Sequence, residues 1–200
     1  LAGPGIKGAV LLAEQGEKLL EKSGVSSAAV QAYMPFYKKM IALSAAGTDS
    51  ATLDIEIRKE LENWKKNVDP LHLAQLGFSS KATTEMVLEN LTPGFATPWM
   101  QFFLASDPAV YLEKISTKVL ALNGEKDIQV LPASNTEGIR KALAKSKSPR
   151  YEIKILPGLN HLFQHCLVCN VEEYGLLEES FAESALSEIT SWLKKNVLQK

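Results

Sequence analysis

The feature that most constrains the fold is a short apolar run, VLAL at residues 119–122, which Asn123 and Gly124 bring to an end. Such a run, ended by turn-forming residues, is typical of a strand buried on both faces of a parallel sheet. A second strand is predicted over residues 151–156, where apolar residues alternate with polar ones and Pro157-Gly158 follow. The second half of the chain therefore predicts two strands.

Helical patterns follow each of these strands. Ser134 and Glu137 have the spacing of a capping box and predict a helix that reaches about Lys145, and Ser180 and Glu183 predict the start of the last helix. The buried stripe of the last helix is expected to consist of Ala182, Leu186, Ile189, Leu193 and Val197. Strand, helix, strand, helix is typical of an α/β sheet. Because two strands are too few to bury these helices, we expect further strands before Leu1.

The first half of the chain predicts a mostly helical region over residues 1–105, and residues 106–200 then form the C-terminal part of the sheet. Apolar residues recur at helical spacing over residues 9–20, 26–45 and 50–68, and Pro35 is expected to kink the second helix. Shorter helices are expected after Ser79-Ser80 and from Trp99 to Leu104, the latter following the helix breakers Pro93, Gly94 and Pro98. The expected core stripes are Val30, Met34, Tyr37 and Ile41 in the second helix and Leu53, Ile57, Leu61, Trp64 and Val68 in the third.

Composition and charge argue against several classes of protein. The net charge of −1 gives no general attraction to nucleic acid or to an anionic membrane. No apolar run approaches the ~18 residues of a membrane span. No signal peptide is recognisable, but the chain begins with Leu1 rather than Met, so the sequence leaves the compartment open between cytoplasmic and exported.

A glycine-rich motif near the start is not expected to bind a dinucleotide. Residues 3–8 match G-x-G-x-x-G. In a dinucleotide-binding unit the first helix leads to a second strand, whereas residues 26–45 predict a second helix. We interpret the motif as a turn that leads from the end of a strand into a helix.

Both cysteines and two of the three histidines fall within residues 161–169, which suggests either a metal site or a redox site. His161, His165, Cys166 and Cys169 offer zinc-binding atoms, but the adjacency of His165 and Cys166 is unfavourable for one tetrahedral ion. A redox C-x-x-C motif should follow a first strand and open a helix, and this one does neither. We therefore predict no metal and no cofactor, with both cysteines as small buried hydrophobic residues or bystanders.

Two loops carry the residue types of an acid–base pair. Asp127 follows the first predicted strand, and His161 follows the second. Because ligand-handling residues of open α/β sheets lie where the strands end, an acid and a histidine at this edge could orient and charge a general base. The alternatives are that Asp127 is a turn aspartate that bonds its own backbone, and that His161 is a structural loop histidine.

The segments VLALNGEKDIQVLP and LPGLNHLFQ resemble the acid and histidine segments of the α/β-hydrolase superfamily. They are similar to the bacterial esterase-like branch that is grouped with dienelactone hydrolases and prolyl-oligopeptidase-type serine hydrolases. LAGPG resembles the segment after that branch's sixth core strand, the following helices resemble its cap, and SFAESALSEITSWL resembles its closing helix. The segment HCLVCNVEEYG departs from the pattern, because more polar residues are expected there.

The resemblance implies a serine hydrolase of small carboxylic esters, with Asp127 as the acid and His161 as the base of the catalytic triad. It also implies a cap that shapes an apolar pocket, whose wall residues could be Trp99, Met100, Phe102 and Phe103. No G-x-S-x-G is present, so the serine and the oxyanion hole are expected upstream of Leu1, and this truncated chain alone is expected to be inactive. The alternatives are a peptidase or thioesterase of the same fold, or an inactive interaction module. We expect a homo-oligomer or a complement with the missing N-terminal part.

Overall fold

A computed structural model describes residues 3–198 and divides them into two compact units. The helical unit comprises residues 7–106, and the sheet unit comprises residues 107–198 together with residues 3–6. Residues 3–6 join the sheet unit because Gly5 donates its backbone N–H to the buried Oδ1 of Asn135 at 2.9 Å. A Cβ at Gly5 would lie 1.9 Å from the Asn135 carbonyl oxygen, so only glycine fits there. Leu1 and Ala2 of the LAGPG segment lie outside the described residues.

The helical unit consists of short and medium helices with polar N-caps. Ser26, Asp49, Asp69, Ser80 and Thr97 each accept a backbone N–H of the first turn that follows, which satisfies donors that a helix start leaves unpaired. The helices are α1 (Gly8–Lys22), α2 (Ser27–Ala45), α3 (Ser50–Lys65), α4 (Pro70–Gln75), α5 (Lys81–Phe95) and α6 (Pro98–Ala105). The element after α1 is thus a helix, as predicted, which argues against a dinucleotide-binding unit.

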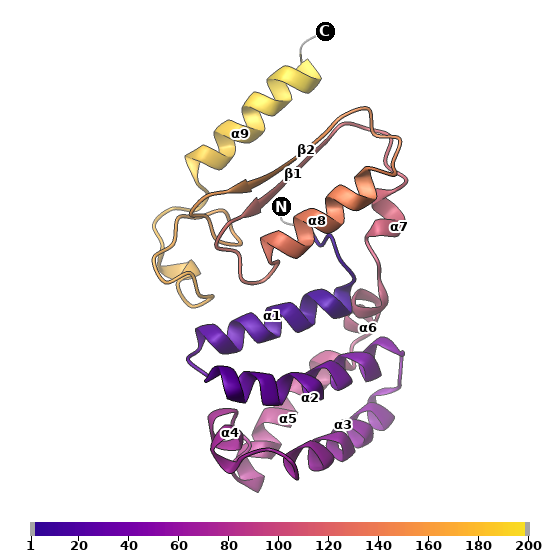
Figure 1. The fold of residues 1–200 in the computed structure, drawn as a ribbon, viewed down its shortest axis with the longest axis vertical. Helices are drawn as coiled ribbons and strands as arrows, with labels where there is room; N and C mark the ends of the chain where they lie inside the picture. Colours follow the sequence, from indigo (N-terminus) through magenta and orange to yellow (C-terminus); the bar gives the residue numbers. More distant parts are fainter. Residues whose placement is uncertain (1–2, 199–200) are drawn as a thin grey trace. The chain divides into compact units, whose positions relative to one another are not determined.

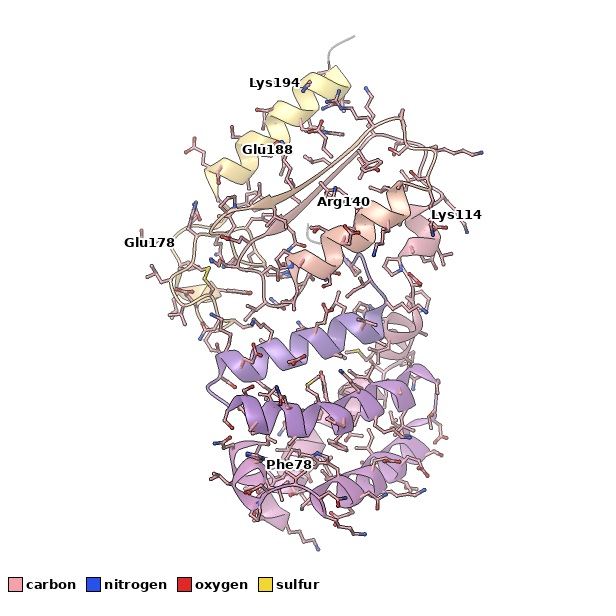
Figure 2. All side chains as sticks on the ribbon, in the orientation of Figure 1. Phe78, Lys114, Arg140, Glu178, Glu188 and Lys194 are labelled. Carbon is pink, nitrogen blue, oxygen red and sulfur yellow. A yellow bond between two sulfur atoms is a disulfide. The ribbon has the colours of Figure 1, made fainter. Side chains whose placement is uncertain are left out.

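The core of the helical unit lies on the predicted stripes of α2 and α3. All four predicted α2 positions are buried, and Leu53, Ile57 and Leu61 of α3 are at most 1% exposed. Aromatic side chains pack together in this core, where the centre of the Trp64 ring lies 5.3 Å from that of Phe36 and 5.4 Å from that of Phe78, which is labelled in Figure 2. Val68, the last position of the predicted α3 stripe, lies after the end of the helix, and Phe78, Leu88, Phe95 and Leu104 complete this core from outside the two stripes.

Two helices of the helical unit continue through a proline, and the kink expected at Pro35 stays a prediction. Helix α2 continues through Pro35, and α5 continues through Pro93 and Gly94 to Phe95. The prediction that Pro93 and Gly94 break the helix is wrong. Phe95 is only 4% exposed, so burying its ring favours the additional turn over an earlier end.

The sheet unit consists of two parallel strands between two helices. Strand β1 (Val119–Gly124) pairs with β2 (Tyr151–Leu156) from Val119↔Tyr151 to Gly124↔Leu156. Helix α8 (Pro132–Leu143) lies on one face of the sheet and α9 (Glu183–Leu193) on the other (Figure 1). Shorter elements are α7 (Ala109–Leu112), the 3₁₀ turn η1 (Tyr174–Leu176) and the π-helical end η2 (Lys194–Leu198). The mixed α/β class is confirmed, with a smaller sheet than a full doubly wound fold.

Both predicted capping boxes of the sheet unit are wrong. Helix α8 begins at Pro132, so Ser134 lies inside the helix, and α9 is preceded by Ala182, whose side chain cannot accept a hydrogen bond. In α8 the proline is a better start signal than the serine, because its fixed φ suits the first helical position and its missing N–H is not needed there. The helix therefore starts two residues before the predicted cap.

The exposed positions of α9 and β1 also differ from the prediction. Leu186, Leu193 and Val197 are 51%, 41% and 55% exposed, while Ala185 and Trp192 are buried. Ala182 is buried and Ile189 packs against the core of the sheet unit, as predicted, so the buried face is only partly rotated from the predicted stripe. Residues 119–121 of β1 are half-buried and only residues 122–124 are buried, so the strand is not buried along its whole predicted length. Within the part of the chain that the structure describes, none of the helices combines the length and apolar character needed to cross a bilayer.

Candidate active site

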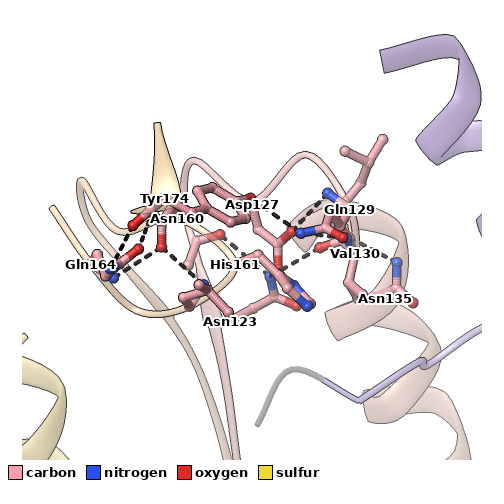
Figure 3. Close-up of polar contacts among 12 residues, drawn as sticks. Asn123, Asp127, Gln129, Val130, Asn135, Asn160, His161, Gln164 and Tyr174 are labelled. Carbon is pink, nitrogen blue, oxygen red and sulfur yellow. Dashed lines mark hydrogen bonds and ion pairs between the residues drawn. The ribbon is translucent and has the colours of Figure 1, made fainter. Parts of the chain in front are cut away.

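The acid lies in the turn that follows β1. Asp127 is 2% exposed, and its Oδ1 accepts the backbone N–H groups of Gln129 and Val130, each at 2.8 Å. These are the contacts of an aspartate that closes its own turn. Its other oxygen, Oδ2, lies 3.2 Å from Nδ2 of Asn123 and 2.9 Å from Nδ1 of His161 (Figure 3). One oxygen thus fixes the turn, and the other contacts the histidine.

A tight loop after β2 holds His161 in place. Asn160 is fully buried, and its Oδ1 accepts the backbone N–H groups of Leu162 at 2.9 Å and of Gln164 at 3.0 Å. Phe163 has a φ of 58°, a left-handed conformation that a residue other than glycine keeps only where its surroundings fix it. The hydrogen bonds of Asn160 before His161 and the buried ring of Phe163 after it fix this conformation of the loop.

Hydrogen bonds fasten the acid turn to the histidine loop. Glu125 N–H donates to the Leu156 carbonyl at 2.9 Å, and Lys126 N–H donates to the Leu159 carbonyl at 2.8 Å. Gly158 N–H donates to the Glu125 side chain at 2.9 Å, and this bond lowers the pKa of Glu125, with a smaller contribution from Lys126. A Cβ at Gly124 would lie 2.3 Å from the Leu159 carbonyl oxygen, so glycine is required for this close approach.

His161 has one side toward the buried acid and retains access to solvent. Its side chain is 25% exposed, whereas that of Asp127 is 0% exposed. Because an ionised carboxylate only accepts hydrogen bonds, the contact assigns the imidazole proton to Nδ1. Nε2 is then the ring nitrogen that can accept a proton. The predicted hydrogen bond between the pair is confirmed, and its catalytic role stays a prediction.

Tyr174 reaches the acid turn from a later part of the chain. Its hydroxyl accepts a hydrogen bond from Nε2 of Gln129 at 3.3 Å (Figure 3). Burial raises the pKa of Tyr174, the bond from Gln129 opposes this rise, and the charge of Asp127 adds to it. The phenol therefore remains protonated beside the acid and adds no charge to the site.

A disulfide joins Cys166 and Cys169, so the prediction that they are bystanders is wrong. Glu173 accepts the backbone N–H groups of Leu167, Val168 and Cys169 at 2.8, 3.1 and 2.6 Å. Successive N–H groups that converge on one anion form a nest, and the φ of 60° at Cys169 is part of this geometry. The turn that follows the histidine loop is thus held by one covalent bond and one carboxylate.

The four residues considered as a zinc set do not form one cluster. His161 contacts Asp127, whereas Nδ1 of His165 lies 3.0 Å from the Glu179 carboxylate. In the described part of the chain, the close group of potential ligand atoms is that of Cys166, Cys169 and Glu173, within 4.8 Å of one another. Its sulfurs are bonded to each other, and its carboxylate already accepts backbone N–H groups. The absence of a metal stays a prediction.

The proposed wall residues all lie on α6 of the helical unit. Trp99 and Phe102 are 67% and 66% exposed, while Met100 and Phe103 pack against the helical core. A cavity of about 400 Å³ lies between α1 and α2, and none of the four residues lines it. Because Asp127 and His161 belong to the sheet unit, the role of these residues in substrate binding stays a prediction.

Sequence reasoning missed the residues that hold the pair. Asn123 could have been noticed, because it is a polar residue at the end of an apolar strand. Asn160, next to the histidine, offers a weaker signal of the same kind, since asparagine commonly closes turns. Glu173 and Tyr174 gave no signal, because their partners come from irregular segments whose path no periodic pattern predicts.

Comparisons with protein-family models, with curated proteins and with solved structures found no match to this chain.

Proposed function

We propose that Asp127 and His161 are the acid and base of a serine hydrolase that cleaves carboxylic esters, in a chain of the α/β-hydrolase type. The observation that carries this proposal is the 2.9 Å hydrogen bond between Asp127 Oδ2 and His161 Nδ1. A buried carboxylate that fixes the tautomer of an accessible imidazole can also stabilise the imidazolium that forms during catalysis. The position of both residues after the ends of parallel strands supports the same assignment.

The nucleophile in this proposal is a serine outside these 200 residues. In the described part of the chain, no serine hydroxyl hydrogen-bonds to His161, and the sequence contains no G-x-S-x-G. Nε2 of His161 would take the proton of the serine hydroxyl as its oxygen attacks the ester carbonyl carbon. The same nitrogen would return the proton to the departing alcohol, and water would then release the acid by the same steps.

The test uses the chain extended at its N-terminus by its natural coding sequence. We expect this protein to hydrolyse p-nitrophenyl esters and to be labelled on one serine by a fluorophosphonate. His161→Ala should lower kcat by at least about ten-thousandfold. The matched control is His165→Ala, because His165 pairs with Glu179 rather than with Asp127. Undiminished ester hydrolysis by the His161→Ala protein would refute the assignment.

The same assay separates the related activities. A peptidase or a thioesterase would use the same acyl-transfer chemistry, so kcat/KM for matched amide, thioester and ester substrates decides among them. The 200-residue chain alone should show no labelling. Labelling of any of its own serines would contradict the proposal that the nucleophile lies outside it.

A second candidate function is that of an interaction module without activity. It is favoured by the described sheet, in which β1 and β2 have only each other as partners, and by the exposed leucines of α9. Unpaired strand edges and exposed apolar side chains favour association. Light scattering over a range of concentrations should then find an oligomer, or a complex with a separately produced N-terminal part. A monomer at all concentrations, alone and with that part, would argue against this candidate.

A further inference from the structure

We propose that Asn123 is a positioning residue for the acid–base pair. Its carboxamide N–H holds Asp127 Oδ2 in the position where this oxygen accepts the Nδ1–H of His161. The catalytic meaning of this inference rests on the proposed function. The positioning itself is a property of the folded chain, and it can be measured without any substrate.

The contacts of Asn123 link the end of β1 to the whole acid turn. Asn123 is 2% exposed, and its Nδ2 lies 3.2 Å from Asp127 Oδ2. The same amide lies 3.1 Å from the Val130 carbonyl oxygen and 3.3 Å from the Gly124 carbonyl oxygen. A single buried side chain therefore contacts the start of the turn, its end and the functional carboxylate (Figure 3).

The two oxygens of Asp127 are held from two directions. Oδ1 accepts two backbone N–H groups of its own turn, and these fix the position of the carboxyl carbon. They hold Oδ1, but because the Cβ–Cγ torsion has a broad minimum, small rotations within the tolerance of these bonds still change the direction of Oδ2. The N–H of Asn123 restricts this rotation from a residue that is paired in the sheet opposite Ile155. A residue of a paired strand is held more rigidly than a residue of the loop that carries His161.

A simpler role for Asn123 would be to close the turn by bonding the two carbonyl groups. Both roles predict that its loss destabilises the sheet unit, because two buried acceptors lose a donor. Only the positioning role predicts a change at His161. In water the neutral imidazole prefers its proton on Nε2, so the Nδ1–H form depends on a correctly placed acceptor. The ratio of the two tautomers therefore distinguishes the roles.

The experiment measures the ¹⁵N chemical shifts of the histidines in the 200-residue chain at a pH where they are neutral. His161→Gln assigns the signal of His161. We expect mainly the Nδ1–H form in the unaltered chain. Asn123→Leu, which has a similar volume and no donor, should shift the ratio toward Nε2–H by at least about tenfold, since a bond to a charged oxygen is lost.

The matched control is Asn135→Leu. Asn135 is also fully buried in the sheet unit and also holds a backbone group, but it contacts Gly5 rather than Asp127. It should lose stability without a change of tautomer. If Asn123→Leu does not fold, Asn123→Ala removes the same amide without adding volume and carries the same test.

Three results would overturn the inference: a folded Asn123 variant with an unchanged ratio, an equal shift in Asn135→Leu, or an unaltered chain that is mainly Nε2–H. Failure of the hydrolase proposal gives a different result. The extended chain would then show no ester hydrolysis, or hydrolysis that is undiminished in His161→Ala, while the tautomer of His161 would still respond to Asn123.

Discussion

Replacing Glu173 by alanine tests whether one carboxylate holds the turn that follows the histidine loop. The side chain is 9% exposed and accepts the backbone N–H groups of Leu167, Val168 and Cys169. The disulfide connects only the two ends of this turn, so the orientation of the peptide groups between them depends on Glu173. Glu173→Ala removes the acceptor and leaves the covalent bond intact.

After this substitution, the three backbone N–H groups differ in whether water can replace the carboxylate as their acceptor. Leu167 is 92% exposed and Val168 is 60% exposed, so water can bond their N–H groups, whereas Cys169 is 7% exposed. A hydrogen bond to a charged group contributes about 1.5–3 kcal/mol, and a buried donor left without a partner costs about 1–3 kcal/mol. We expect Glu173→Ala to lower the local free energy of opening by about 2–4 kcal/mol. Glu173→Gln keeps one oxygen and should lose about half as much.

Amide hydrogen exchange of Cys169 is the direct assay. A loss of about 2–4 kcal/mol corresponds to exchange that is roughly 30- to 1000-fold faster. The matched control is Glu172→Ala, which changes an exposed neighbour and should leave the rate unchanged. If Glu173→Ala exchanges less than about threefold faster at Cys169, the carboxylate does not hold the turn and the reasoning is refuted.

Two further predictions concern the helical unit. Leu53→Ala should lower its free energy of unfolding by about 3 kcal/mol in a urea titration, because Leu53 is fully buried, whereas Ile55→Ala at a 64% exposed site should change it by less than about 1 kcal/mol. Burial raises the pKa of Tyr37 to about 12 and also raises that of Tyr33, to which the neighbouring Tyr37 adds. Both phenols stay protonated in the folded chain, so their contribution to the free energy of unfolding is fully present below pH ~10. As the pH rises from there toward the folded-state pKa, the contribution of each tyrosine falls by about 1.4 kcal/mol per pH unit. An absorbance titration in which all five tyrosines ionise together near pH ~10 while the chain stays folded would contradict this.

Regular core contacts account for the parts of the fold that the sequence predicted. Val30, Met34 and Ile41 recur at the spacing of one helix face, and all are buried. Helix starts failed where two signals competed, as at α8, where Pro132 precedes the serine that was taken as the cap. The stripe of α9 failed for a different reason. A small residue, Ala185, lies at the buried face while Leu186 is exposed, so size and hydrophobicity ranked the positions wrongly.

The acid–base pair was predictable because parallel strands bring their carboxyl ends to one edge. Asp127 and His161 are 34 positions apart, yet the strand register places both directly after the same edge of the sheet. Their supports lacked such a rule. The contact of Glu173 with the turn at residues 167–169 depends on a left-handed Cys169, and the disulfide depends on the same path of the chain. The cysteines were interpreted as buried hydrophobic residues or bystanders, because the failure of C-x-x-C to follow a strand or open a helix argued only against a redox motif and said nothing of a structural bridge.

Oδ1 of Asp127 bonds the turn and Oδ2 bonds Asn123 and His161, so two substitutions of this residue should have different effects. Asp127→Asn keeps an oxygen for the N–H groups of Gln129 and Val130, because the opposite orientation would place its NH₂ against both donors. That NH₂ then faces the donors of Asn123 and His161, so it should drive His161 to the Nε2–H tautomer while costing about 1–2 kcal/mol of stability. Asp127→Ala removes the turn contacts as well and should cost about 3–5 kcal/mol. Urea titrations and the ¹⁵N shifts of His161 measure both effects on the 200-residue chain. Equal destabilisation by the two substitutions, or an Nδ1–H imidazole in Asp127→Asn, would show that the oxygens do not act separately. In the extended chain, Asp127→Asn should then lower kcat by about ten-thousandfold with little loss of folded protein, because a histidine with its proton on Nε2 cannot accept one from the serine.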